Sequence, residues 1–199
     1  DIDSAEKENA DVITFSGTGE PTLNSKIGAM ISYAKRFGKP VVVLTNASLL
    51  YRKEVRNDLS NADIVALKLD APNERLFKKI NRPVEGLTLS RIIDGMHKFR
   101  SMFNGKFAIQ MMFIKENMDY AREMAEIARE IAPDEVQLDT PLRPSSVPPL
   151  PKEEMERIER EFEGLNVISV YKRKKPKVHP INIKETLLRR PLSEFDQYV

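Results

Sequence analysis

The chain has 199 residues, of which 41% are hydrophobic and 31% are charged, and its formal net charge is +2. This is the composition of a soluble globular protein with enough apolar residues for one large domain or two small ones. The longest apolar runs have only the length of core strands, and residues 1–11 are acidic and polar. A membrane span and a signal peptide are therefore excluded, and a cytoplasmic protein is expected. The small net charge excludes a general attraction to nucleic acids or membranes.

The sequence contains no cysteine and only two histidines. Disulfides, thiolate metal sites and a cysteine nucleophile are thus excluded within these residues. His97 falls in a predicted helix and His179 stands beside Pro180, so the histidines predict no metal site. Because residue 1 is Asp rather than Met, we interpret the chain as a fragment or a processed product.

Strands and helices are predicted to alternate along the chain. Apolar runs rich in β-branched residues predict strands near 11–16, 40–46, 62–71, 106–114, 134–140 and 166–171. Apolar residues at helical spacing predict helices within 27–37, 49–60, 73–80, 88–103, 119–131 and 152–163. Asn24 or Ser25 is the expected cap of the first helix, and Gly38 and Pro40 are expected to end it.

The apolar runs are continuous rather than alternating, which indicates strands that are covered on both faces. Together with the alternating order, this predicts a parallel α/β sheet or barrel. We expect one α/β domain over residues 1–171, followed by a basic linker and short helical tail over 172–199. The proline-rich segment 141–151 predicts a loop that crosses the surface.

Polar residues follow the predicted strands, at the carboxyl ends where parallel α/β proteins bind their ligands. They are Ser16 to Pro21, Thr45 and Asn46, Lys68 and Asp70, Lys115 to Asn117, and Asp139 and Thr140. Since strand ends normally meet water and helix caps, each residue alone is more often structural than functional.

The loop SGTGEP, residues 16–21, is the most informative of these segments. It lacks the lysine of a nucleotide P-loop, and Thr22 stands where a dinucleotide fingerprint has its third glycine. Gly17 and Gly19 allow a ligand to approach the main chain, whereas Glu20 opposes a phosphate and favours a cation. This chemistry predicts a ligand with an ammonium group. The alternative is that Glu20 only begins a helix, where the helix dipole favours an acidic residue.

Five segments carry a family resemblance, and they occur in the order ITFSGTGEPTLN, PVVVLTNASLL, ADIVALKLDA, INRP and VQLDTPLRP. In this order they resemble the radical S-adenosylmethionine (SAM) superfamily. Within it, the most similar group is the Fe-S oxidoreductases related to wybutosine-synthesis and molybdenum-cofactor-type enzymes. The resemblance covers residues 11–150 and implies a partial (β/α)6 barrel of the TIM type, with helices outside and the first β/α unit missing.

The resemblance also implies the chemistry and the residues that serve it. In this family a [4Fe-4S] cluster, held by three cysteines, reductively cleaves SAM to a 5′-deoxyadenosyl radical that takes hydrogen from a substrate. The implied SAM-binding residues are Ser16, Gly17, Thr18, Gly19, Glu20, Pro21, Thr45, Asn46, Lys68, Asp70, Gln110 and Met112. Loop 16–21 would hold the SAM amino group, and residues 136–138 would offer main-chain contacts to the adenine. The residues expected to face the substrate are Asn81, Arg82, Asn117 and Arg143.

This sequence departs from the family pattern at several positions. Ala47 stands where the family usually has glycine, Lys68 where close relatives usually have serine, and Asp139 where asparagine is common. The cysteine loop belongs before residue 11, so the fragment is predicted to hold no cluster and to be inactive alone. The full-length protein would need an electron donor and a substrate, for which tRNA or another nucleotide is one candidate.

Two other functions are weighed against this one. The basic run 172–177 could bind RNA or a protein, which would make the chain a non-catalytic α/β module. Such a run is more commonly a solvated linker. A sugar-phosphate TIM-barrel enzyme is disfavoured, because Glu20 repels phosphate in the glycine-containing loop.

Overall fold

A computed structural model describes residues 10–17, 19–142 and 145–173 of the chain. Thr18, Arg143, most of the basic run 172–177 and the predicted helical tail lie outside these residues. In the part of the basic run that is described, Lys172 Nζ lies 2.6 Å from Glu159 Oε1 and forms an ion pair with it. The division of the chain at residue 171 stays a prediction.

The described residues form one six-stranded sheet whose spatial order is β1 to β6. The strands are β1 (Ile13–Phe15), β2 (Val41–Thr45), β3 (Ile64–Lys68), β4 (Lys106–Met112), β5 (Glu135–Asp139) and β6 (Val167–Ser169). Every neighbouring pair is parallel, which confirms the predicted α/β fold. Within the described residues β1 and β6 are the edges of the sheet, so the barrel is not closed.

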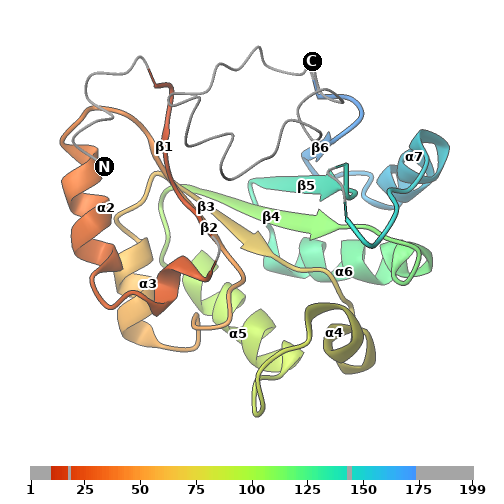
Figure 1. Cartoon of the computed structure of the whole chain (residues 1–199), viewed down its shortest axis with the longest axis horizontal. Coiled ribbons are helices and arrows are strands. Elements are labelled where there is room, and N and C mark those ends of the chain that lie inside the picture. The colour runs from red at the N-terminus through yellow and green to blue at the C-terminus, as the bar shows by residue number, and fades with distance from the viewer. Residues whose placement is uncertain (1–9, 18, 143–144, 174–199) are drawn as a thin grey trace.

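A helical segment lies between each pair of strands. The helices are α2 (Ile27–Lys35), α3 (Lys53–Leu59), α4 (Glu74–Asn81), α5 (Leu89–Arg100), α6 (Ala121–Ile131) and α7 (Lys152–Glu161). Two 3-10 turns, η1 (Pro21–Leu23) and η2 (Met118–Tyr120), precede α2 and α6. Because each right-handed crossover advances by one strand in the same direction, the helices come to lie on one side of the sheet, as Figure 1 shows for α2, α3, α5 and α6.

The predicted boundaries of the first helix are partly wrong. Lys26 precedes α2 and makes no side-chain cap, since Asn24 Oδ1 instead accepts from Lys26 N at 2.9 Å. Asn24 ends η1, so the expected cap, Asn24 or Ser25, lies one or two residues before the observed N-cap position of α2. The predicted end of this helix agrees better with the structure. The helix α2 stops at Lys35, and Gly38 adopts a left-handed conformation with φ of 65°.

The two faces of the sheet differ, contrary to the expectation that both are covered. Val43, Val65 and Phe107 are partners in the parallel register, and each is fully buried. Phe107 packs against Phe99 of α5, with ring centroids 5.9 Å apart. On the opposite face, Lys68 and Gln110 are register partners and both are only half-buried. Successive side chains of a strand point to opposite faces. One face therefore forms the core, while the other offers polar groups. No helix in the described part is long and apolar enough to cross a membrane.

Candidate functional site

Two adjoining hollows lie at the carboxyl ends of the strands. The larger, a cleft of about 770 Å³, lies between the strand ends, α4 and the start of α5. Its polar and charged lining consists of Glu20, Asn46, Ser48, Tyr51, Lys68, Asp70, Asn81, Arg82, Glu85 and Arg91. The smaller, of about 210 Å³, is lined among others by Ser16, Gly17, Gly19, Glu20, Pro21, Thr45, Asn46, Lys68 and Gln110. Below, the larger is called the cleft and the smaller the hollow.

The structure thus brings together most of the residues expected to bind SAM. Nine of them line the hollow, and Asp70 and Met112 line the adjoining cleft. Thr18 is outside the described residues. The parallel arrangement explains this gathering, because strands that run in the same direction end at the same edge of the sheet. On β5, Val136 and Leu138 are fully buried, and their main-chain contact to adenine stays a prediction.

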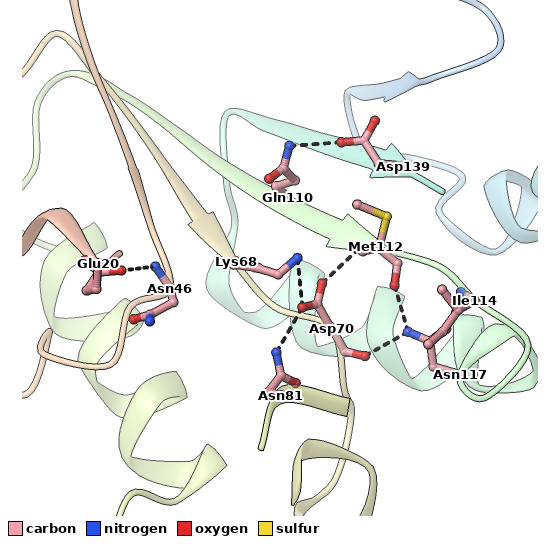
Figure 2. Close-up of polar contacts among 10 residues, drawn as sticks. All are labelled: Glu20, Asn46, Lys68, Asp70, Asn81, Gln110, Met112, Ile114, Asn117 and Asp139. Carbon is pink, nitrogen blue, oxygen red and sulfur yellow. Dashed lines mark hydrogen bonds and ion pairs between the residues drawn. The ribbon is translucent and has the colours of Figure 1, made fainter. Parts of the chain in front are cut away.

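Glu20 ties the first loop to β2 through its carboxylate. Oε1 accepts hydrogen bonds from Thr22 N at 3.0 Å, Thr22 Oγ1 at 2.6 Å and Thr45 Oγ1 at 2.5 Å. Oε2 accepts one, from Asn46 N at 2.7 Å (Figure 2). Glu20 is also the N-cap of η1, so it does begin a short helical turn, while its contact with a ligand stays a prediction. Because a carboxylate oxygen accepts more than one hydrogen bond, Oε2 retains capacity for a further donor.

The glycines of the first loop leave its main chain open to a ligand. A Cβ atom built on Gly17 or Gly19 would have no protein atom within 4 Å. No protein contact therefore requires glycine at either position. The space above the main chain is free, as the approach of a ligand needs.

The turn after β2 is held in an uncommon backbone conformation. Ala47 has φ of 62° and is almost fully buried, in a region of φ that favours glycine. Thr45 Oγ1 accepts from Ala47 N at 3.1 Å, and Asn46 Oδ1 accepts from Ser48 N at 2.9 Å. These bonds keep the turn in place, so the Thr45 and Asn46 side chains shape the hollow.

Asp70 lies at the centre of a buried polar network and is 3% exposed. Its Oδ2 lies 3.0 Å from Lys68 Nζ and accepts from Asn81 Nδ2 at 2.9 Å. Its Oδ1 accepts from Met112 N at 2.9 Å (Figure 2). Asp70 therefore links β3, β4 and the end of α4. It positions Lys68 in the hollow and is not itself open to a ligand.

Asn117 is a structural residue, which corrects its expected contact with substrate. It is 0% exposed. Its Nδ2 donates to Asp70 O at 2.8 Å and to Met112 O at 2.9 Å, and its Oδ1 accepts from Ile114 N at 2.8 Å (Figure 2). All of these partners are main-chain atoms, so the amide supports the ends of β3 and β4. Arg143, the other predicted contact in a later loop, lies outside the described residues.

Asp139 was expected only as a polar residue at a strand end, and the structure shows that it holds a predicted SAM-binding residue, Gln110. Its Oδ2 accepts from Gln110 Nε2 at 2.9 Å, on the face of the sheet that carries Lys68 (Figure 2). Burial raises the pKa of Asp139 above its usual range, although the charge of Arg173, the Gln110 hydrogen bond and the charge of Lys68 oppose this shift. The signal in the sequence was its place directly at a strand end.

Asn81 and Arg82 line the cleft, as predicted for residues near a substrate. Arg82 is exposed and left-handed, with φ of 47°, and it ends α4. Sequence reasoning missed a second arginine of the cleft, Arg91, whose guanidinium lies 3.6 Å from the centroid of the Tyr51 ring. Such a cation–π contact fixes the direction of the guanidinium.

The residues present do not fit an iron–sulfur cluster. The sequence has no cysteine, and in the described part no three His, Cys, Asp or Glu residues gather as a metal site. The same residues do fit the methionine end of SAM. An acceptor with spare capacity, open main chain and a lysine converge on one hollow.

The fold and the hollow define a parallel α/β protein with a candidate ligand site at the carboxyl edge of its sheet. A family model described as the radical SAM superfamily matches residues 2–128. The chain belongs to the radical SAM superfamily.

The chain is also similar to a curated protein. The chain is 35% identical over 148 residues to the UPF0026 protein MJ1312 of Methanocaldococcus jannaschii, a match that covers 73% of this chain and 46% of that protein. The chain thus spans about half the length of this curated relative.

Among solved structures, Streptococcus suis SuiB bound to S-adenosylmethionine has a TM-score of 0.65 at 17% identity, over 84% of this chain and 41% of that chain. Archaeal TYW1 has a TM-score of 0.59 at 14% identity, over 78% of this chain and 50% of that chain. At these identities the likeness shows the fold alone.

Proposed function

We propose that this chain is the SAM-binding core of a radical SAM Fe-S oxidoreductase whose cluster cysteines lie outside these 199 residues. In such an enzyme, reductive cleavage of bound SAM supplies a 5′-deoxyadenosyl radical for hydrogen abstraction from a substrate. The observation that carries the proposal is the arrangement of Glu20: Oε1 accepts three hydrogen bonds within the protein, while Oε2 accepts one among the described residues. An ammonium group is the natural second partner of Oε2, because ionised donors and acceptors form the stronger hydrogen bonds.

The other residues of the hollow would complete the binding of SAM. The main chain at Gly17 and Gly19 is open for polar contacts. Lys68 Nζ carries three N–H donors, and its ion pair with Asp70 uses only part of them. The remaining donors would hold the carboxylate of SAM or a ribose hydroxyl. Gln110, fixed by Asp139, would contact the same ligand from β4. Each group is a donor or acceptor held by a second residue, which lowers the entropy lost on binding.

Substrate and partners belong to the proposal as well. An electron donor is needed for the cluster, and tRNA or another nucleotide is the substrate we propose. SuiB has been solved bound to the precursor peptide SuiA, so the fold also accepts a peptide in a relative. The cations Lys68, Arg82 and Arg91 in the cleft support an anionic substrate in this chain. A cytoplasmic location and the inactivity of the cysteine-free chain stay predictions.

The test uses the full-length gene product, reconstituted anaerobically with iron and sulfide. We expect a [4Fe-4S] absorption spectrum and, with dithionite, release of 5′-deoxyadenosine from SAM. Glu20→Gln should raise the KM for SAM at least about tenfold, since one charge-assisted hydrogen bond contributes about 1.5–3 kcal/mol. Glu161→Gln is the matched control, because Glu161 is exposed at the end of α7 and does not line the hollow.

Two results would contradict the proposal. The first is a full-length protein that forms no cluster and cleaves no SAM. The second is a Glu20→Gln variant that is folded and has the same KM for SAM as the wild type and the Glu161→Gln control.

A further inference from the structure

Asn81 lines the cleft and carries a buried acceptor atom without a partner. Its Nδ2 donates to Asp70 Oδ2 at 2.9 Å, while its Oδ1 is buried and has no hydrogen-bond partner among the described residues. The amide cannot be turned over, because Oδ1 would then face a carboxylate that only accepts hydrogen bonds. Asp70 thus fixes the orientation in which Oδ1 points away from it (Figure 2). A buried carbonyl without a donor is costly, and a ligand donor would remove that cost.

Two arginines face the same cleft without a carboxylate partner. Within the described part of the chain, neither Arg82 nor Arg91 takes part in an ion pair, yet both line the cleft. Arg91 is held against the ring of Tyr51 at 3.6 Å. Arg82 has a left-handed backbone conformation and directly precedes Pro83. The following proline disfavours such a conformation, so the backbone at Arg82 is strained. Strain of this kind persists where the surrounding structure maintains it, and it is concentrated at functional sites.

The acidic residues of the cleft leave these arginines uncompensated. Glu20 and Asp70 line the cleft, but their carboxylates are engaged by hydrogen bonds and by Lys68. Glu85 is exposed and also lines the cleft, so the cleft contains one free carboxylate and two free guanidinium groups. The rest of the wall is largely apolar and includes Phe77, Ile80, Leu87, Ile92 and Ile114. Such a cleft favours a ligand with an apolar or planar body and an anionic group.

We propose that the cleft binds the substrate, and that the substrate is a phosphorylated compound with an N–H or O–H donor. Arg82 and Arg91 bind the phosphate, Asn81 Oδ1 accepts from the donor, and the apolar wall holds the body between them. Phosphate is favoured over carboxylate because two guanidinium groups match a dianion with three acceptor oxygens. A nucleoside monophosphate is the simplest compound with all three features. The inference rests on the proposed function, which assigns the adjoining hollow to SAM and proposes a nucleotide substrate, and it adds the residues of the cleft that recognise the phosphate and the donor.

The experiment measures binding of three probes to the full-length protein by calorimetry, with saturating SAM and no reductant. GMP has phosphate and base, guanosine lacks the phosphate, and ribose 5-phosphate lacks the base. We expect GMP to bind at least about tenfold more tightly than either of the other probes. Because SAM is present throughout, binding of GMP in the hollow itself would be excluded by competition.

Variants then test the three groups separately. Arg82→Ala and Arg91→Ala should each weaken GMP binding at least about fivefold, with guanosine binding unchanged. Asn81→Leu, which keeps the size but removes the acceptor, should weaken binding of both GMP and guanosine. The controls are Arg160→Ala on α7 and Asn57→Leu on α3, both at exposed positions outside the cleft lining. Affinity for SAM and the circular dichroism spectrum show whether each variant is folded.

The outcomes separate this inference from the proposed function. If SAM binds and GMP does not, or if guanosine or ribose 5-phosphate binds as tightly as GMP, the inference is wrong and the proposed function stands. If folded Arg82→Ala and Arg91→Ala bind GMP like the wild type, the inference is wrong as well. If GMP binds as expected but SAM does not bind at all, the assignment of the hollow fails while the cleft keeps its ligand.

Discussion

The two ends of the parallel sheet use their polar residues differently. At the amino end, Asp63 accepts from Val41 N at 2.8 Å and from Lys35 Nζ at 2.8 Å, which fixes the start of β2. Asp134 does the same for β4: it accepts from Phe107 N at 2.7 Å and is paired with the Arg100 guanidinium. Each carboxylate has a main-chain donor and a cation. These residues fasten one strand to its neighbour.

At the carboxyl end, several groups lack such partners or lie in unfavourable conformations. Asn81 Oδ1 is buried without a donor, and Arg82 and Ala47 have positive φ. Burial raises the pKa of Asp139 despite the charge of Arg173 and the hydrogen bond from Gln110. The two ends belong to the same strands, so the difference is not one of fold. The comparison teaches that the carboxylates where the strands begin are paired within the protein, whereas the groups left for a ligand lie where the strands end.

The largest effect is expected for Asp70→Ala, because Asp70 is the centre of the buried polar network at the carboxyl end. The change leaves Lys68 without its counter-ion and leaves the buried donors Met112 N and Asn81 Nδ2 unpartnered. Lys68 is 36% exposed, so most of the loss comes from the two donors left without an acceptor, at about 1–3 kcal/mol each. We expect the free energy of unfolding, measured by urea titration, to fall by about 3 kcal/mol.

Asp94→Ala is the control for Asp70→Ala. Asp94 forms an ion pair with Lys98 on the surface of α5, and its side chain is 56% exposed. Exposed pairs of this kind contribute about 0.3–0.5 kcal/mol. If Asp70→Ala were no more destabilising than this control, the network around Asp70 would not hold the carboxyl end together.

A smaller loss of stability, without loss of binding, is expected for Asp134→Ala at the amino end. The change removes the acceptor of Phe107 N, and Phe107 is fully buried. Arg100 keeps its hydrogen bond to Ala132 O, and Asp134 is 39% exposed, so the loss is moderated by water. We expect about 1–2 kcal/mol by urea titration, with an unchanged affinity for SAM. A variant with weakened SAM binding would show that the two ends are not independent.

The sequence predicted the order of the strands better than the exposure of their faces. Alternating strand and helix patterns are sufficient for a parallel sheet, because parallel strands need crossover connections. The patterns did not separate the faces, since Leu44 and Ala66 are apolar residues on the side that lines the hollow. Because apolar side chains occur on both faces, each strand forms one continuous apolar run in the sequence.

The candidate site was predictable where it depends on strand ends and not where it depends on distant contacts. Glu20 and Asn46 were expected at one edge, and the parallel register brings them within a hydrogen bond of 2.7 Å. The burial of Asn117 and the stacking of Arg91 on Tyr51 join elements that no local pattern connects. The resemblance to the family could not supply these contacts, because its motifs describe single loops.

The smallest expected effect, and the one that sharpens the comparison most, is the pH dependence of Asp139→Asn. Because the pKa of Asp139 is raised in the folded state, mainly by burial, the folded protein binds this proton more tightly than the unfolded chain. The stability that comes from the bound proton is present at low pH and is lost as pH rises through the folded pKa. Asparagine mimics the protonated side chain and can still accept from Gln110. The variant should therefore match the wild type near pH 3 and exceed its free energy of unfolding by about 0.5 kcal/mol at pH 7.

Asp63→Asn at the amino end should show the opposite sign. The hydrogen bond from Lys35, followed by that from Val41 N, lowers the pKa of Asp63. Its carboxylate therefore stabilises the folded protein above the ordinary Asp pKa of about 3.9, and this contribution is lost as pH falls through the lower folded value. Urea titrations between pH 3 and pH 7 should give two difference curves that diverge as pH rises, upward for Asp139→Asn and downward for Asp63→Asn. Parallel curves would mean that both carboxylates experience the same surroundings, and the contrast between the two ends of the sheet would have no electrostatic basis.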